Sequence, residues 1–130
     1  MDIKQLEVGT FYLIHDGSNT GHPGFLVWKD DEANLYLFIK FGSTPNESNI
    51  PFAHSLNKNI SRNYVYKRPF LAKRKNIGKK WVCDYKITEN DKNVFLSLLG
   101  NNPVYSKNIN RKDKRFYSLV VKHGKIKTAL

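Results

Sequence analysis

The sequence predicts an α+β fold that is mainly β: a compact antiparallel sheet curled into a small barrel, with helices packed against it. Three observations favour this class. Short runs rich in aromatic and β-branched residues alternate with turn-forming residues over the first two thirds of the chain. A helical period appears only late. The length of 130 residues, with 40% hydrophobic and 13% aromatic residues, allows one core, so we expect a single domain over residues 1–130.

Six segments have the composition and period of strands. The first ends at the turn former Asp16-Gly17. The second and third are joined by an acidic loop at residues 30–34 and form a hairpin at the centre of the core, because the third is apolar on both faces apart from Lys40. In the last segment, Trp81, Cys83 and Tyr85 share one face. The predicted strands are residues 10–15, 24–29, 35–41, 50–55, 64–71 and 81–87.

The period changes after residue 87. Thr88 is a good N-cap, and Asp91 follows it three residues later. The apolar side chains then recur at helical spacing, and Gly100 is expected to end the helix. The predicted stripe is Val94, Phe95, Leu98 and Leu99.

Residues 111–122 fit either a basic helix or a short strand over residues 116–121. We favour the helix, because Asn110 can cap it, Asp113 falls in its first turn and Gly124 can stop it. In that helix we expect the inward side chains to be Phe116, Leu119 and Val120.

The net charge of +11 is unevenly distributed. The first fifty residues carry three lysines and seven acids, whereas the rest carry 19 basic and four acidic residues. Such a one-signed field attracts a polyanion, and the absence of a groove-reading motif favours single-stranded or folded RNA over duplex DNA. The predicted RNA-binding residues are the basic residues of the acid-free stretch 58–80 and one aromatic residue among them: Lys58, Arg62, Tyr64, Lys67, Arg68, Lys73, Arg74, Lys75, Lys79 and Lys80.

Other classes fit the composition poorly. No apolar run approaches the roughly 20 residues of a membrane span, and the first residues lack a leader pattern, so we expect a soluble cytoplasmic protein. The lone Cys83 excludes an internal disulfide and a multi-cysteine zinc site, and we expect it to be a small buried side chain on a strand. With no carboxylate-rich cluster, we expect neither a metal nor a cofactor.

Three loops carry groups that could do chemistry. His22 lies between strand-breaking residues before the second strand and is a candidate acid or base, although the loop could be a simple turn. Ser43 and Thr44 follow the most apolar strand, where their hydroxyls and the Lys40 amine could bind a phosphate; ordinary turn chemistry is the alternative. His54 ends the fourth strand and is either functional or a half-buried structural residue.

Taken together, several short blocks resemble the endoribonucleases of type III toxin-antitoxin systems. The resemblance is nearest to the CptN and TenpN type, more distant to ToxN, and weakest after Gly100. The blocks stand in the same order along most of the chain: residues 18–23, Lys40-Phe41, residues 43–46, residues 54–56 and residues 63–75.

The resemblance implies a curved SH3-like barrel similar to MazF and Kid, and a metal-independent ribonuclease that inhibits growth. It implies a small structured antitoxin RNA of repeats, with a pseudoknot-type fold, which the toxin cuts into units and which then inhibits it. Protein and RNA would assemble into a closed ring or cage with more than one toxin copy. Many such systems defend against phage by abortive infection.

The resemblance also suggests site residues. Ser43, Thr44 and Pro45 match the paired hydroxyls and proline of the ToxN active-site loop, whereas Asn46 falls where ToxN has a catalytic lysine. His22 lies close to the position of another ToxN lysine, and is the first candidate to replace the missing charge. Lys40 and His54 are the others.

RNA cleavage by 2′-hydroxyl attack needs a base, an acid and donors for the phosphoryl oxygens. We expect Ser43 and Thr44 to orient the phosphate, His22 and His54 to transfer protons, and Lys40 to stabilise developing charge. Two alternatives remain: a non-catalytic RNA-binding barrel, and a gyrase-directed toxin of similar fold. The strongly basic second half disfavours the latter.

Overall fold

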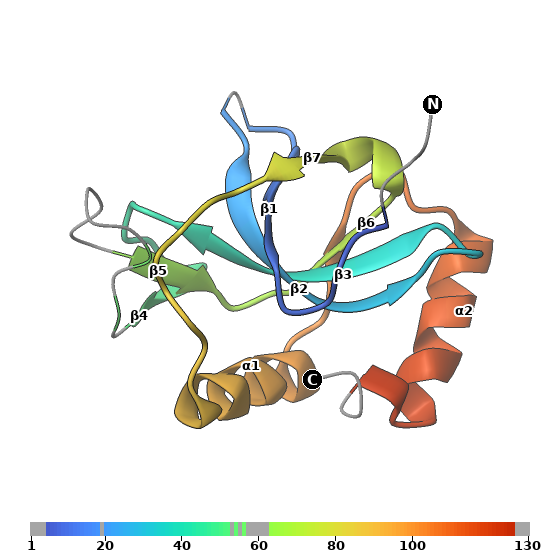
Figure 1. The fold of residues 1–130 in the computed structure, drawn as a ribbon. Coiled ribbons are helices and arrows are strands. Elements are labelled where there is room, and N and C mark those ends of the chain that lie inside the picture. The colour runs from blue at the N-terminus through green and yellow to red at the C-terminus, as the bar shows by residue number, and fades with distance from the viewer. Residues whose placement is uncertain (1–4, 19, 53, 55, 57–62, 127–130) are drawn as a thin grey trace.

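The computed structural model describes residues 5–18, 20–52, 54, 56 and 63–126. Within these residues, eight strands form one curled sheet that does not close, and two helices pack on it (Figure 1). The predicted mainly β, α+β fold with a curved antiparallel sheet is therefore confirmed. One pair, between the sixth and eighth strands, is parallel.

The elements follow one another in a simple order along the chain. A single turn of 3-10 helix, Arg74–Asn76, separates the sixth and seventh strands. The strands are β1 (Phe11–Ile14), β2 (His22–Asp30), β3 (Leu35–Gly42), β4 (Asn49–Phe52), β5 (Asn63–Tyr66), β6 (Phe70–Ala72), β7 (Ile77–Lys80) and β8 (Tyr105–Ser106), and the helices are α1 (Glu89–Asn101) and α2 (Arg111–Lys122).

The central strand is β3. The order across the sheet is β4-β5-β3-β2-β1-β7, and β6 pairs with β3 beside β5. The predicted strand 64–71 is thus two strands, which pair with different parts of β3. The chain bends between them before Pro69, which has no N–H to donate to a ladder. This bend lets one edge of β3 bind two strands and curls the sheet.

Residues 81–87 are not the predicted sixth strand, and the strand β7 lies just before them. Trp81 donates its backbone N–H to the Phe11 carbonyl at 2.9 Å, after which the chain leaves the sheet. Alternate side chains still pack on the core: Trp81, Cys83, Tyr85 and Ile87. The period of two was genuine, but it reflects an extended segment lying on the core and not a hydrogen-bonded strand.

Cys83 lies in that extended segment and not on the expected strand. Its side chain is half-buried against the core, where burial and then the nearby charge of Asp84 raise the pKa of the thiol. A raised pKa keeps the thiol protonated and poorly nucleophilic, which fits a packing residue.

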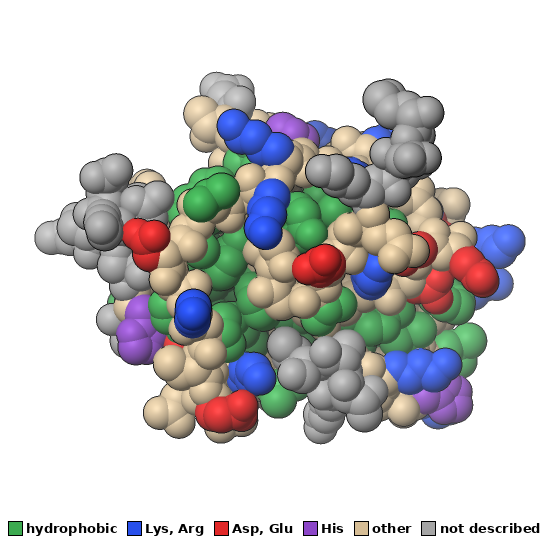
Figure 2. Space-filling model, in the orientation of Figure 1, with side chains coloured by type: hydrophobic (Ala, Val, Ile, Leu, Met, Phe, Trp, Pro, Cys, Tyr) green, Lys and Arg blue, Asp and Glu red, His purple; other side chains and the backbone are tan. Residues whose placement is uncertain are grey.

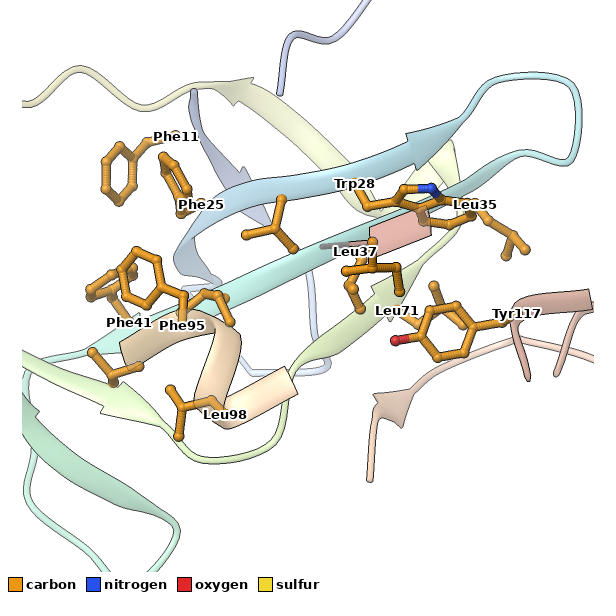
Figure 3. Close-up of a cluster of buried hydrophobic side chains, with 14 of the residues drawn as sticks. Phe11, Phe25, Trp28, Leu35, Leu37, Phe41, Leu71, Phe95, Leu98 and Tyr117 are labelled. Atoms are coloured by element: carbon orange, nitrogen blue, oxygen red, sulfur yellow. The ribbon is translucent and has the colours of Figure 1, made fainter. Parts of the chain in front are cut away.

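The apolar side chains gather on both faces of the sheet. The face toward the helices contains Leu37, Phe41 and Phe25, which pack with Phe95 of α1 and Tyr117 of α2 (Figure 3). The other face holds a second cluster, including Tyr36 and Phe38. Since successive side chains of β3 point in opposite directions, this one strand contributes to both clusters.

Both predicted helices and their caps are present. The Thr88 hydroxyl accepts the Asp91 N–H at 3.1 Å, and the Asn110 side chain accepts the Asp113 N–H at 2.8 Å. Instead of ending at Gly100, α1 reaches Asn101.

The expected inward face of α2 is partly wrong. Val120 is buried, but Phe116 and Leu119 are 38% and 54% exposed, and Tyr117 is buried in their place. Its ring packs edge-on against Trp28 with centroids 6.1 Å apart, so the face of α2 that contacts the sheet is the one that carries Tyr117. Among the described helices, neither has the length and apolar character needed to cross a bilayer.

Phe95→Ala should destabilise the fold strongly. The Phe95 ring is fully buried and contacts Phe25, Phe41 and Phe52, so its removal leaves a cavity between α1 and the sheet. We expect a loss of about 3–5 kcal/mol in the free energy of unfolding, measured by urea titration. The matched control Phe116→Ala should lose less than about 1 kcal/mol. Equal losses in the two variants would contradict this packing.

Candidate functional site

Three polar side chains project from the sheet face opposite the helices. His22 begins β2, two residues before Gly24, which pairs with Lys40 of β3. Tyr66 ends β5, next to Val65 of the helix-side core. Because side chains alternate along a strand, these registers bring His22, Lys40 and Tyr66 together at one end of the sheet.

The carboxylate of Asp16 ties this group together. It lies in the turn after β1, and its side chain is only 3% exposed. Oδ2 is 2.8 Å from the His22 Nδ1 and accepts a hydrogen bond from the Lys40 Nζ at 2.8 Å. Oδ1 accepts one from the Ser18 hydroxyl at 2.7 Å. One buried anion therefore fixes an imidazole and an amine from two neighbouring strands.

Asp16 is ionised despite its burial. Burial by itself raises the pKa of a carboxyl, but the hydrogen bonds from Lys40 and Ser18 and the charges of Lys40 and His22 outweigh it. They hold the pKa of Asp16 well below its usual range. The site thus contains a permanent negative charge that the Lys40 ammonium balances.

The ionised carboxylate also sets the tautomer of His22. Because a carboxylate can only accept, the Nδ1 facing it must carry the hydrogen, which leaves Nε2 as the reactive nitrogen. Nε2 lies 3.4 Å from the Tyr66 hydroxyl, and the two rings meet edge to face with centroids 5.5 Å apart. This arrangement suits proton transfer at Nε2.

Lys40 is held on two sides. Its Nζ pairs with Asp16 and lies 4.1 Å from the centre of the Tyr66 ring, a cation–π geometry. The side chain is 11% exposed. The amine is thus a fixed charge within the wall of the site.

The loop that delivers His22 depends on Gly21. The φ of Gly21 is 71°, in the left-handed region, and a Cβ there would approach the Ile14 carbonyl oxygen to 2.7 Å. Only glycine allows the chain to turn this close to β1 and place His22 opposite Ile14.

His22 and the predicted hydroxyls share one cavity. This cavity of about 310 Å³ is lined by His22, Ser43, Thr44 and Tyr66, with Trp81 and the Gly21 loop on its walls. The backbone carbonyl of Thr44 accepts a hydrogen bond from the Asn49 side chain at 2.9 Å, which fixes the loop after β3. The structure therefore brings His22, Ser43 and Thr44 to one cavity, and Lys40 is joined to His22 through Asp16.

His54 and Asn46 do not join this group. The His54 imidazole stacks on Tyr85 with centroids 5.3 Å apart, and its Nε2 lies 3.4 Å from Asp91 Oδ2, so it does not line the cavity. Asn46 donates its N–H to the Asn49 side chain at 3.2 Å and accepts the Ser48 N–H at 2.8 Å. It stabilises the turn and supplies no charge.

The predicted RNA-binding residues are spread over several surfaces. Lys67 and Arg68 lie beside Lys40, around a second cavity. Lys75, Lys79 and Lys80 are exposed around β7. On the face seen in Figure 2, the basic side chains stand apart and form no single patch.

Part of this charge is paired within the protein. Lys73 forms an ion pair of 2.7 Å with Asp113 of α2, and the Arg74 guanidinium donates to the Ile77 carbonyl at 3.0 Å. Tyr64 is half-buried on β5. Lys58 and Arg62 lie outside the described residues.

Sequence reasoning missed two residues of the site. Asp16 has the signature of a turn residue, and Tyr66 that of one aromatic among several. Neither shows its function in the sequence, because Asp16 meets Lys40 across 24 positions and Tyr66 meets His22 across 44. Among the described residues, no three His, Cys, Asp or Glu side chains are grouped so as to hold a metal ion.

Compared with protein-family models, curated proteins and solved structures, the chain matches none.

Asp16→Asn should change how stability depends on pH. The pKa of Asp16 is lower in the folded protein than the ordinary 3.8, so its ionised form stabilises the fold above pH 3.8, and this stabilisation is lost as pH falls below that value. Urea titrations between pH 6 and pH 2 should show a steeper loss in the natural protein than in Asp16→Asn, by up to about 1.4 kcal/mol per pH unit.

Asp31→Asn is the matched control. The pKa of Asp31 is also lowered, chiefly by its hydrogen bond from Lys29, but its side chain is 42% exposed. Solvent screening should make its effect on the pH dependence smaller. An Asp16→Asn profile parallel to that of the natural protein would exclude a carboxylate that is kept ionised by its partners at this position.

Proposed function

We propose that this protein is a metal-independent endoribonuclease. It cleaves RNA by attack of the 2′-hydroxyl on the adjacent phosphorus and leaves a 2′,3′-cyclic phosphate and a 5′-hydroxyl. The observation that carries the proposal is the cavity shared by His22, oriented by Asp16, and the hydroxyls of Ser43 and Thr44. The reaction needs a base, an acid for the departing 5′ oxygen and donors for the phosphoryl oxygens, and this cavity brings a group that can carry a proton together with phosphate-binding donors.

His22 is the residue that we assign to proton transfer. In the neutral imidazole, Nε2 can accept the proton of the 2′-hydroxyl, and the Asp16 carboxylate stabilises the imidazolium that forms. The imidazolium then returns this proton, through water, to the departing 5′ oxygen, which gives the 5′-hydroxyl. The Ser43 and Thr44 hydroxyls donate hydrogen bonds to the phosphoryl oxygens. His54 takes no part, since its imidazole is engaged with Tyr85 and Asp91.

Lys40 contributes through charge. An ionised carboxylate next to a phosphate would repel it, and the Lys40 ammonium at 2.8 Å offsets that charge. The Asp16–Lys40 pair therefore lets an anionic substrate approach the His22 imidazole, although that imidazole is bonded to a carboxylate.

The biological setting follows from the sequence resemblance. We propose a cytoplasmic toxin of a type III toxin-antitoxin system that processes, and is then inhibited by, a structured repeat RNA in a closed assembly with several toxin copies. The net charge of +11 supports an RNA partner. A non-catalytic RNA-binding module is the other function that fits this charge, and the cleavage assay separates the two.

His22→Ala and Thr44→Ala should abolish cleavage while RNA binding persists. Loss of the proton acceptor should lower the rate by about 10²- to 10⁴-fold. The assay incubates purified protein with single-stranded RNA in excess EDTA and identifies the termini of the fragments. Cyclic phosphate and 5′-hydroxyl ends are expected from the natural protein.

His54→Ala is the control for this experiment, because it removes an imidazole that lies outside the cavity. It should cleave within about twofold of the natural rate in the folded fraction. Binding without any cleavage by the natural protein would favour the RNA-binding module, and equal loss of binding and cleavage in His22→Ala would contradict the assigned role.

Replacing Lys75, Lys79 and Lys80 together with Gln should weaken RNA binding and flatten its salt dependence. These side chains are exposed, so each can release a counterion when it pairs with a phosphate. The slope of log K against log salt should fall in magnitude by up to about 2, measured by fluorescence anisotropy. Lys92→Gln, on α1 and paired with Glu89, should leave the slope unchanged. An unaltered slope in the triple variant would remove β7 from the interface.

A further inference from the structure

A second cavity adjoins the first at Tyr66. Its volume is about 480 Å³, within the range of sites that bind small molecules. Tyr66 borders both cavities, and Lys40, whose Nζ lies over the Tyr66 ring, lines the second. A ligand in one cavity is therefore a neighbour of a ligand in the other.

An exposed aromatic platform forms part of the second cavity. Tyr105 is 38% exposed, and its ring stacks on Phe70 with centroids 5.5 Å apart and planes at 29°. The Tyr105 N–H donates to the Pro69 carbonyl at 2.8 Å, which anchors β8 beside β6. A ring that is fixed from below and open to a cavity is suited to stacking with a planar base.

Cations surround this platform. The Arg68 guanidinium lies 5.8 Å from the Tyr105 ring and donates to the Val104 carbonyl at 3.0 Å. The Lys67 Nζ donates to the Glu47 carbonyl at 3.1 Å. Lys67 and Arg68 place two positive charges at the cavity against the single carboxylate of Glu47, whereas the charge of Lys40 is balanced by Asp16. In this arrangement a nucleobase can stack on the Tyr105 ring while the phosphates next to it pair with the cations.

We propose that the second cavity is a subsite for one nucleobase of the bound RNA strand, next to the nucleotide held at His22. Tyr105 is the stacking platform, and Lys67 and Arg68 pair with the flanking phosphate. The inference rests on the proposed function, because it assumes that the RNA strand held at His22 continues into the second cavity. It extends that function by naming what positions the strand.

The test is an abasic scan of a short single-stranded RNA that is 2′-O-methylated throughout and so cannot be cleaved. Each base is removed in turn, and affinity is measured by fluorescence anisotropy. In the natural protein, removing the base at one position should weaken binding about tenfold, as expected for one stacked base. In Tyr105→Leu the intact RNA should bind about tenfold more weakly, with no further loss at that position.

Two variants control for the change. Tyr105→Phe keeps the ring and should keep the sensitive position. Phe116→Leu removes an aromatic ring of the same 38% exposure on α2 and should behave like the natural protein. The subsite would be overturned if, at every position of the RNA, the loss of affinity caused by base removal simply added to the loss caused by Tyr105→Leu.

A cross-linking experiment needs no variant. RNA with 5-iodouracil at the sensitive position should cross-link to Tyr105 on irradiation, and peptide mass spectrometry identifies the residue. A cross-link confined to residues outside the cavity would overturn the proposal. So would Tyr105-dependent binding of free nucleoside monophosphates without any sensitive position in the strand, which would indicate a site for free nucleotides.

These outcomes separate the two proposals. Coupling between Tyr105 and one base of the methylated RNA, together with no cleavage of the unmethylated RNA of the same sequence, would uphold the subsite and reject the nuclease. Cleavage without such coupling would uphold the nuclease and reject the subsite.

Discussion

The candidate site depends on the buried carboxylate of Asp16. An uncompensated charge at 3% exposure would be strongly destabilising, so Asp16 can exist there only with the donors of Lys40, His22 and Ser18 in place. The same requirement fixes the donors, because each must point at the carboxylate. One electrostatic constraint thus orients the imidazole, immobilises the amine and closes the loop that precedes β2.

The sheet registers make this constraint possible. Residues of β3 at odd positions, such as Leu37 and Phe41, pack under the helices, whereas Lys40 points the other way. A shift of β3 by one residue would bury the ammonium beneath α1 and expose its neighbours. Packing of the helix-side core therefore selects the register that presents the polar group, although the hydrogen-bond partners of Asp16, namely Ser18, His22 and Lys40, lie outside that core.

Local signals in the sequence predicted the local features. The hairpin around residues 30–34, the caps at Thr88 and Asn110 and the position of His22 at a strand start depend on near neighbours and are confirmed. The bend before Pro69 depends on which edge of β3 is available, and the departure of residues 81–87 from the sheet follows their last bond to Phe11 of β1; the sequence alone predicted unbroken strands in both places. The role of Asp16 was not predicted, because an ordinary turn aspartate and a buried, paired aspartate look the same in a sequence. The roles of Ser43, Thr44 and the basic stretch stay predictions.

The segment between β7 and α1 has a further consequence for motion. The Trp81 N–H donates to the Phe11 carbonyl of the sheet, and the Asp84 N–H donates to the Leu56 carbonyl at 3.2 Å. Alternate side chains of the segment also pack on the core. Segments held mainly by side chains open at lower free energy than paired strands. Since Trp81 lines the His22 cavity, a local opening of this segment would widen the cavity while the sheet stays intact. For the proposed RNA substrate, partial unfolding of this wall would be a route into the cavity.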